Sequence, residues 1–253
     1  MTFGEGLQQG IALVVGASQG IGLGFVRHLL EEARIARVYA TYRNPNTAAA
    51  LLALNHPQLT CLPMDATQES AIAQCAADIQ ARGDTLDLMI NCVGILHDGD
   101  LQPEKGLRQI DSANLLHYFQ VNSLPTVLLA KHLQPLLKKR TGSVFTTISA
   151  KVGSIEDNHL GGWYGYRASK AALNMFLKTI AIEYRRKNPH TIVVALHPGT
   201  TDTRLSKPFQ RNVSPGKLFS VDRTVSQLLT IIHGLTEADS GKFFSWDGSR
   251  LPW

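Results

Sequence analysis

Several features that mark common protein classes are scarce or missing in this 253-residue chain. Its three cysteines, Cys61, Cys75 and Cys92, form no C-x-x-C pair and show no Cys/His ligand spacing, which argues against a disulfide framework and a metal site. No apolar run approaches about 18 residues, so no membrane span is expected. Residues 1–5 lack a basic segment followed by an apolar one, so no secretory signal is predicted. We therefore expect a cytoplasmic protein with no membrane partner.

Charge is also modest and spread along the chain. Charged residues make up 18% of the sequence and the net charge is +5, while hydrophobic residues make up 44%. A basic cluster of three residues, Lys138 to Arg140, is expected at a helix C-terminus, where cations suit the helix dipole. Such scattered charge predicts no nucleic-acid partner but suits an anionic cofactor. No boundary, repeat or low-complexity tract divides residues 1–253, so one domain is predicted.

A glycine-rich stretch near the N-terminus is the first feature that points to a ligand. The apolar run Ile11 to Val15 stops at Gly16, Gly20 and Gly22 follow, and Leu23 to Leu30 has helical period. Strand, glycine turn and helix N-terminus together present backbone N–H groups to a diphosphate. The spacing G-x-x-x-G-x-G differs from the standard dinucleotide motif G-x-G-x-x-G, and a simple tight turn is the alternative.

Strands and helices alternate along the rest of the chain. This alternation predicts an α/β fold, a Rossmann-type doubly wound parallel sheet with helices on both faces. Pro125 and Pro135 should kink or divide the long helix of 111–139. Residues 200–218 have no clear period, which is typical of a mobile substrate lid. The predicted strands are 11–15, 36–41, 59–64, 86–90, 144–149, 192–196 and 242–244, and the predicted helices are 23–30, 47–54, 68–81, 111–139, 163–187 and 221–233.

The residues after the second predicted strand indicate which nicotinamide cofactor is preferred. In dinucleotide folds an acidic residue about 20 positions past the last glycine holds the ribose 2′-hydroxyl of NAD. Here Tyr42 occupies that position and Arg43 follows it. A guanidinium matches a 2′-phosphate, so the sequence predicts NADP(H) in preference to NAD(H). An arginine on a solvated turn is the alternative.

Tyr166 and Lys170 lie four residues apart and share one face of a predicted helix. A free phenol has a pKa of about 10, and lowering it by about three units takes roughly 4 kcal/mol. An ammonium at ~4 Å in an effective dielectric near 20 supplies about that much. The pair can therefore make Tyr166 an acid/base for an alcohol–carbonyl couple, although the spacing by itself often occurs by chance.

The whole set of motifs resembles the short-chain dehydrogenase/reductase family. The resemblance rests on Gly16-x-x-x-Gly20-x-Gly22, Asp65, Asn91-Cys92-Val93-Gly94, Asn122, Ser149, Tyr166-x-x-x-Lys170 and Pro198-Gly199-x-x-x-Thr203, which occur in the family's order over essentially the whole chain. Residues 148–155 and 243–253 are similar to the branch that contains C-factor and sniffer-type carbonyl reductases.

The resemblance implies roles for named residues. Tyr166 would be the acid/base, Lys170 would lower its pKa, Ser149 would hold the substrate oxygen, and Asn122 would hold a water in a proton relay. If the resemblance is set aside, Asn122 is interpreted as a polar residue tolerated in a helix, and Asp65 is interpreted as an acidic residue at a helix N-terminus. The implied cofactor-binding residues are Gly16, Ser18, Gln19, Gly20, Ile21, Gly22, Arg43, Asp65, Ala66, Asn91, Gly94, Tyr166, Lys170, Pro198, Gly199, Thr201 and Thr203.

One departure concerns the catalytic serine. The family places it three residues before a glycine, which is Ala150 when counted from Gly153. Ser149 is one residue earlier, and one step along a strand reverses the side-chain direction. Ser154 is the alternative to Ser149. His197 could be a base, but a strand-end histidine packed in the core is the more ordinary interpretation.

The predicted activity is NADPH-dependent interconversion of an aldehyde or ketone and an alcohol. The alternative is a nucleotide-binding signalling protein of the C-factor type with little turnover. The resemblance also implies a homodimer or homotetramer built on the long helices 111–139 and 163–187.

Overall fold

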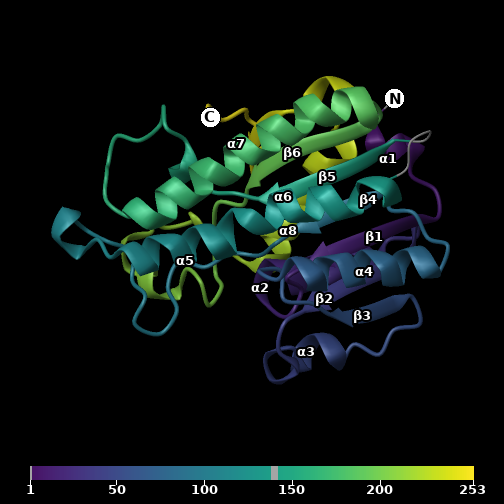
Figure 1. The fold of residues 1–253 in the computed structure, drawn as a ribbon, viewed down its shortest axis with the longest axis horizontal. Helices are drawn as coiled ribbons and strands as arrows, with labels where there is room; N and C mark the ends of the chain where they lie inside the picture. Colours follow the sequence, from purple (N-terminus) through teal and green to yellow (C-terminus); the bar gives the residue numbers. More distant parts are fainter. Residues whose placement is uncertain (1, 138–141) are drawn as a thin grey trace.

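The computed structural model describes residues 2–137 and 142–253, and a seven-stranded parallel sheet forms its centre. The strand order is β3-β2-β1-β4-β5-β6-β9, and every neighbouring pair is parallel (Figure 1). The predicted doubly wound α/β fold is confirmed. The strands are β1 (Gly10–Val15), β2 (Ile35–Tyr42), β3 (Leu59–Pro63), β4 (Leu88–Asn91), β5 (Ser143–Ile148), β6 (Thr191–His197) and β9 (Lys242–Ser245).

Helices cover both faces of the sheet. One face carries α1 (Phe3–Gly6), α2 (Gly20–Glu31) and α8 (Val221–Gly234), and the other carries α4 (Glu69–Ala81), α6 (Leu124–Leu133) and α7 (Tyr164–Lys187) (Figure 1). Along β1, Ala12 and Val14 enter the first core, whereas Leu13 and Val15 enter the second. Burial on both faces explains why the strands are continuous apolar runs.

The long helix predicted for 111–139 is divided near Pro125 and Pro135, as the two prolines predicted. The structure has α5 (Ser112–Asn122), then α6, then a 3-10 turn at Gln134–Leu136. Ser123 separates the two helices, and Pro125 lies in the first turn of α6, where its missing N–H is harmless. The end of the predicted helix, with the cluster 138–140, lies outside the described residues.

Smaller differences concern short elements. The helix predicted for 47–54 is a 3-10 turn, Pro45–Thr47, followed by the short α3 (Ala49–Leu52). Strand β4 begins at Leu88 rather than at 86. In the segment predicted as a lid, β7 (Thr200–Thr201) pairs with β8 (Leu218–Phe219), and a 3-10 helix covers Lys207–Asn212. These pairings depend on contacts distant in sequence, which local periodicity does not report.

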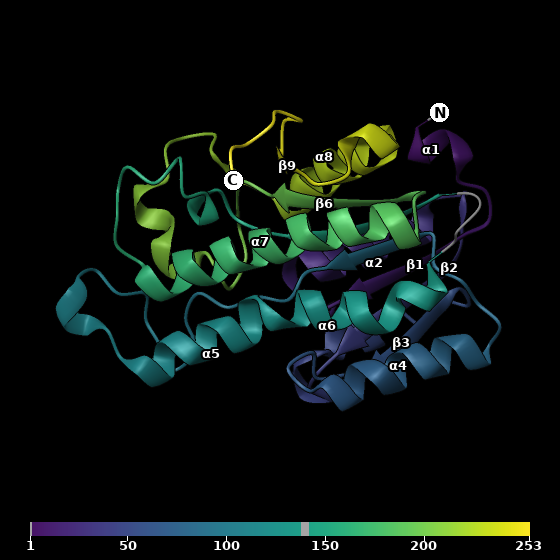
Figure 2. The same ribbon diagram turned by 45° about the horizontal axis from the view of Figure 1, so that its top comes forward.

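The carboxyl ends of the strands and the start of α7 lie at the same end of the molecule. There α5 and α7 run side by side and extend beyond the sheet (Figures 1 and 2). The large apolar side chains exposed on these helices include Leu116, Met175 and Ile182. No helix in the described part of the chain is long and apolar enough to span a membrane.

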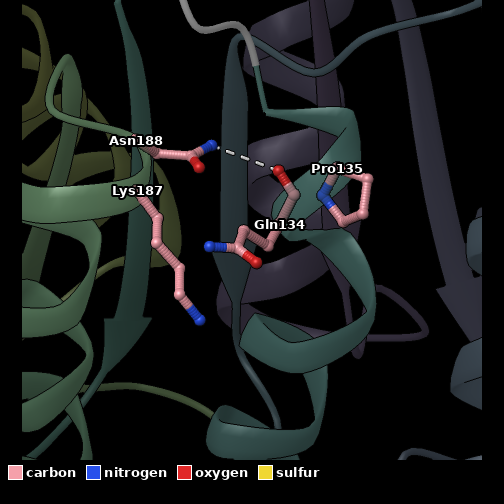
Figure 3. Close-up of a pocket in the computed structure, with 4 residues that line it drawn as sticks. All are labelled: Gln134, Pro135, Lys187 and Asn188. Carbon is pink, nitrogen blue, oxygen red and sulfur yellow. Dashed lines mark hydrogen bonds between the residues drawn. The ribbon is translucent and has the colours of Figure 1, made fainter.

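A surface pocket of about 290 Å³ lies at the opposite end of α7. Gln134, Pro135, Lys187 and Asn188 line it, and Asn188 Nδ2 donates to the Gln134 carbonyl at 3.2 Å (Figure 3). At a rise of 1.5 Å per residue, Lys187 is about 30 Å along the helix from Tyr166. The pocket is therefore separate from the predicted catalytic residues.

Candidate active site

Tyr166 and Lys170 lie in the first turns of α7 and both are buried. Their exposed fractions are 7% and 4%. The Lys170 Nζ is 6.0 Å from the centre of the Tyr166 ring and donates a hydrogen bond to the Ile148 carbonyl at 3.0 Å. The helical i, i+4 spacing thus brings the pair together at the end of β5.

The protonation of this pair differs from the sequence-based expectation. Burial raises the pKa of Tyr166 above its ordinary value, and the neighbouring Tyr118 adds to the effect. Burial lowers the pKa of Lys170 to about 8. The expected lowering of the Tyr166 pKa by Lys170 is wrong for this structure, because desolvation dominates and the ammonium is directed at Ile148. Tyr166 is therefore a protonated phenol at neutral pH, suited to donating a proton.

Asn122 ties three segments together at the last residue of α5. Its Oδ1 accepts from Ile95 N at 2.7 Å, and its Nδ2 donates to the Ile95 carbonyl at 3.0 Å and to Ser169 Oγ at 2.9 Å. A Cβ on Gly94 would lie 3.3 Å from Lys170 Nζ and 3.4 Å from Asn122 Oδ1. Gly94 therefore permits the close approach of Asn122 and Lys170, and Asn122 is more than a tolerated helical residue.

The three candidates for the serine position face different partners. The Ser149 hydroxyl donates to Asn174 Oδ1 at 2.6 Å, one turn beyond Lys170 on α7. The Ser154 hydroxyl donates to the Trp253 carbonyl at 3.1 Å. Ala150 instead packs against the apolar cluster that contains Tyr166. The structure thus packs the Ala150 methyl group against the cluster that contains Tyr166, and both serine hydroxyls donate to other acceptors.

The glycine turn between β1 and α2 has the shape that a diphosphate requires. Gly16 and Gly20 have φ values of 76° and 56°, and a Cβ on Gly22 would lie 2.3 Å from the Gly16 carbonyl. The N-cap Gln19 makes no side-chain cap, so the first N–H groups of α2 remain available to a ligand. Ser18 and Ile21 are half-buried in the same turn. These residues fit a dinucleotide.

Residues at other strand ends surround this turn. Arg43 is exposed directly after β2. Asp65 Oδ1 accepts from Thr67 N and Oγ1 at 2.9 and 2.8 Å, so it shapes the turn after β3 rather than capping α4. The neighbouring Ala66 is buried. Asn91 Oδ1 accepts from Val93 N at 3.0 Å and its Nδ2 donates to Thr126 Oγ1 at 3.3 Å, which shapes the loop after β4.

The segment after β6 reaches the glycine turn as well. A Cβ on Gly20 would lie 3.3 Å from Thr203 Cγ2. Thr201 Oγ1 is 2.8 Å from Thr224 Oγ1 and 3.4 Å from the carbonyl oxygen of the buried Pro198. Gly199 has a φ of 72°. The structure therefore brings Thr203 of this motif against the glycine turn.

His197 is not placed as a base. Its Nδ1 accepts a hydrogen bond from Lys151 N at 3.3 Å, and burial lowers its pKa to about 4. The His197 ring is therefore neutral, and the hydrogen bond at its Nδ1 stabilises the turn after β5. This agrees with the interpretation of His197 as a histidine packed in the core.

An aromatic wall beside Tyr166 was not predicted as a unit. Trp163 is 6.1 Å from Tyr166 and 5.2 Å from Phe209, measured between ring centres, and Tyr118 is 6.3 Å from Tyr166. The Tyr118 hydroxyl donates to the Leu96 carbonyl at 2.7 Å. The sequence analysis missed Tyr118 and Asn174, although helical spacing could have indicated both. Tyr118 precedes Asn122 by one helical turn, and Asn174 follows Lys170 by one turn.

Known proteins share this architecture over its full length. The NADPH-bound carbonyl reductase from chicken fatty liver is 32% identical, with a TM-score of 0.87 over 98% of this chain and 95% of that one. Carbonyl reductase Sniffer of D. melanogaster is 28% identical, with a TM-score of 0.84 over 97% and 100%. C-signal of Myxococcus xanthus is 30% identical over 147 residues, which is 58% of this chain and 83% of that protein.

The glycine turn, the buried Tyr166–Lys170 pair and the parallel sheet define a dinucleotide-dependent oxidoreductase of the short-chain type. A model of the short chain dehydrogenase family matches residues 10–214, so the chain belongs to that family. Within it, the chain is of the sniffer and C-signal type, and the resemblance inferred from the motifs is confirmed. Among residues 2–137 and 142–253, no group of His, Cys, Asp or Glu side chains is arranged to hold a metal ion.

Proposed function

We propose that this protein is an NADPH-dependent carbonyl reductase whose proton donor is Tyr166. The observation that carries the proposal is the buried pair of Tyr166 and Lys170 at the sheet edge that also bears the glycine turn. When bound, the nicotinamide supplies the hydride. Tyr166 donates its phenolic proton to the substrate oxygen, and Lys170 favours the resulting phenolate by its positive charge. Asn122 holds the water through which the proton is replaced.

The aromatic wall favours an apolar aldehyde or ketone as substrate. Trp163, Phe209 and Leu96 lie around Tyr166 and give this side of the site an apolar surface. A panel of such carbonyl compounds, assayed by loss of NADPH absorbance, tests the proposal. Turnover of one or more compounds supports it, and no NADPH oxidation with any of them contradicts it.

A signalling protein with little turnover is the second candidate. The similarity to C-signal favours it, and so does the donation of both serine hydroxyls to other acceptors. It predicts that NADPH binds while the carbonyl panel stays unreacted. The intact Tyr166–Lys170 pair makes the reductase the leading proposal.

Cofactor choice gives a direct prediction at Arg43. We expect NADPH to bind at least about tenfold more tightly than NADH, roughly 1.4 kcal/mol, because the guanidinium pairs with the 2′-phosphate. Arg43→Leu should remove this preference by weakening NADPH binding and leaving NADH binding unchanged. Titration of both cofactors by fluorescence measures it. The control is Arg82→Leu, another exposed arginine, at the C-terminus of α4. Equal binding by the unmodified protein would eliminate Arg43 as the selector.

The serine position gives a second prediction. The Ser149 proton is committed to Asn174, so this hydroxyl cannot donate to a substrate oxygen in the observed arrangement. We expect Ser149→Ala to change kcat/KM by less than about threefold, and Ala150→Ser to raise it by about tenfold by adding a donor beside Tyr166. Steady-state kinetics on one substrate compares the two variants. A large loss in Ser149→Ala would show that Ser149 turns to the substrate during reaction.

Self-association through α5 and α7 is also proposed. The exposed Leu116, Met175 and Ile182 lie on these two helices, where a second copy would cover them. A homodimer or homotetramer is the resulting proposal.

A further inference from the structure

A buried carboxylate that the proposed chemistry does not use lies at the start of α7. Glu104 is in the loop before α5, and only 4% of it is exposed. Its Oε2 accepts a hydrogen bond from Gly165 N at 3.1 Å, and its backbone carbonyl accepts one from Trp163 N at 2.5 Å. The two bonds fasten this loop to the residues immediately before Tyr166.

The first turn of α7 donates to Glu104 because the N-cap residue of the helix provides no side-chain acceptor. Trp163 is the N-cap residue, has a φ of 53° in the left-handed region, and makes no side-chain cap. Ser, Thr, Asp or Asn at that position would normally accept from the first turn. A carboxylate near a helix N-terminus is also favoured by the helix dipole. Glu104 therefore caps α7 from a separate loop.

The packing around the carboxylate is close. A Cβ on Gly165 would lie 2.4 Å from Tyr118 Cδ2 and 2.9 Å from Glu104 Oε1, so glycine is needed there. Oε1 is buried, and no hydrogen-bond donor within the described ranges reaches it. The Glu104 side chain is thus held by the Gly165 amide, and a larger residue at position 165 would collide with Glu104 and Tyr118.

We propose that Glu104 is a positioning residue for Tyr166. By fastening Trp163 and Gly165, it fixes the direction in which α7 begins and hence the place of the phenol relative to Lys170. The edge-to-face contacts of Tyr166 with Tyr118 and Trp163 depend on the same geometry. Glu104 does not touch the reacting atoms. This inference rests on the proposed function, since it assumes that Tyr166 donates the proton.

Three substitutions test the role. Glu104→Ala removes the acceptor, Glu104→Asp keeps the charge but is one methylene too short, and Glu104→Gln keeps an acceptor at the same reach. We expect the alanine and aspartate variants to lower kcat by about 10–100-fold while KM and the NADPH dissociation constant change by less than about threefold. Glu104→Gln should retain most of kcat. The control is Glu156→Ala, an exposed acid in the loop before α7.

Hydrogen exchange at the Trp163 and Gly165 amides tests whether Glu104 fastens the start of α7, without relying on turnover. We expect faster exchange in Glu104→Ala, near-normal exchange in Glu104→Gln, and no change farther along α7. Unchanged exchange in Glu104→Ala overturns the proposal, as does a loss of thermal stability with unchanged kcat. If Glu104→Ala does not fold, equal kcat in the aspartate and glutamine variants overturns it. If the unmodified protein reduces no carbonyl compound, the proposed function fails. The exchange result alone then decides whether Glu104 fastens the start of α7.

Discussion

Replacing Tyr166 with phenylalanine is expected to lower kcat by about 10²–10⁴-fold, the usual contribution of a positioned acid or base. The substitution removes one hydroxyl and leaves the ring in contact with Tyr118 and Trp163. Cofactor contacts at the glycine turn are untouched, so the NADPH dissociation constant should stay within about twofold. Steady-state turnover together with a fluorescence titration of NADPH measures both quantities.

Tyr184→Phe is the matched control for this prediction. Tyr184 is buried in the same helix, and its hydroxyl donates to the Ala130 carbonyl at 2.6 Å. The Ala130 carbonyl keeps the hydrogen bond from Gln134 N, so the variant should lose only about 0.5–1.5 kcal/mol of its free energy of unfolding, with kcat unchanged. Comparable turnover in Tyr166→Phe and in the unmodified protein would contradict the assigned role of Tyr166.

Replacing Lys170 with methionine is expected to make the protein more stable and far less active. Burial lowers the pKa of Lys170 to about 8, so keeping this ammonium charged inside the fold is unfavourable. At about 1.4 kcal/mol per pKa unit, the variant should gain roughly 3–4 kcal/mol in its free energy of unfolding at pH 7. Without the positive charge beside Tyr166, kcat should fall by about 100-fold or more. Denaturant unfolding and steady-state kinetics measure the two effects.

The pH dependence of the Lys170 prediction has a definite sign. The pKa of Lys170 in the folded protein lies below its unfolded value, so the unfavourable contribution is fully present below pH 8. It declines as the pH rises toward 10.5, the ordinary pKa of a lysine, where both states lose the proton. The stability gain of Lys170→Met should therefore vanish above about pH 10.5, and turnover of the unmodified protein should decline above about pH 8. A gain that persists at high pH would show that packing, rather than charge, is its cause. A control is Lys178→Met, which replaces an exposed lysine of the same helix whose ammonium donates to the Gly241 carbonyl at 3.1 Å.

The local pattern of the sequence alone determines most of the sheet and its helices. Strands buried on both faces must be apolar throughout, and a helix with one buried face must have a period near 3.6, so both can be read without distant contacts. The glycine turn is readable for the same reason, because Gly16 and Gly20 adopt positive φ values that glycine permits. Tyr166 and Lys170 meet because they are one turn apart on α7.

Other properties depend on partners that lie far away along the chain. Ser149 and Ala150 follow the last residue of β5, where the chain turns, and the hydroxyl direction is decided by Asn174, 25 residues later. The cap of α7 comes from Glu104, 61 residues before Gly165.

Tertiary structure alone also decided the charge state of the site. Desolvation of Tyr166 and Lys170 is produced by everything packed around them, and it reverses the pKa shift that the helical spacing of the pair predicts for the phenol. Spacing, strand period and glycine content are properties of neighbouring residues, so the sequence determines them by itself. Burial and hydrogen-bond partners are properties of the folded chain, and only the tertiary structure supplies them.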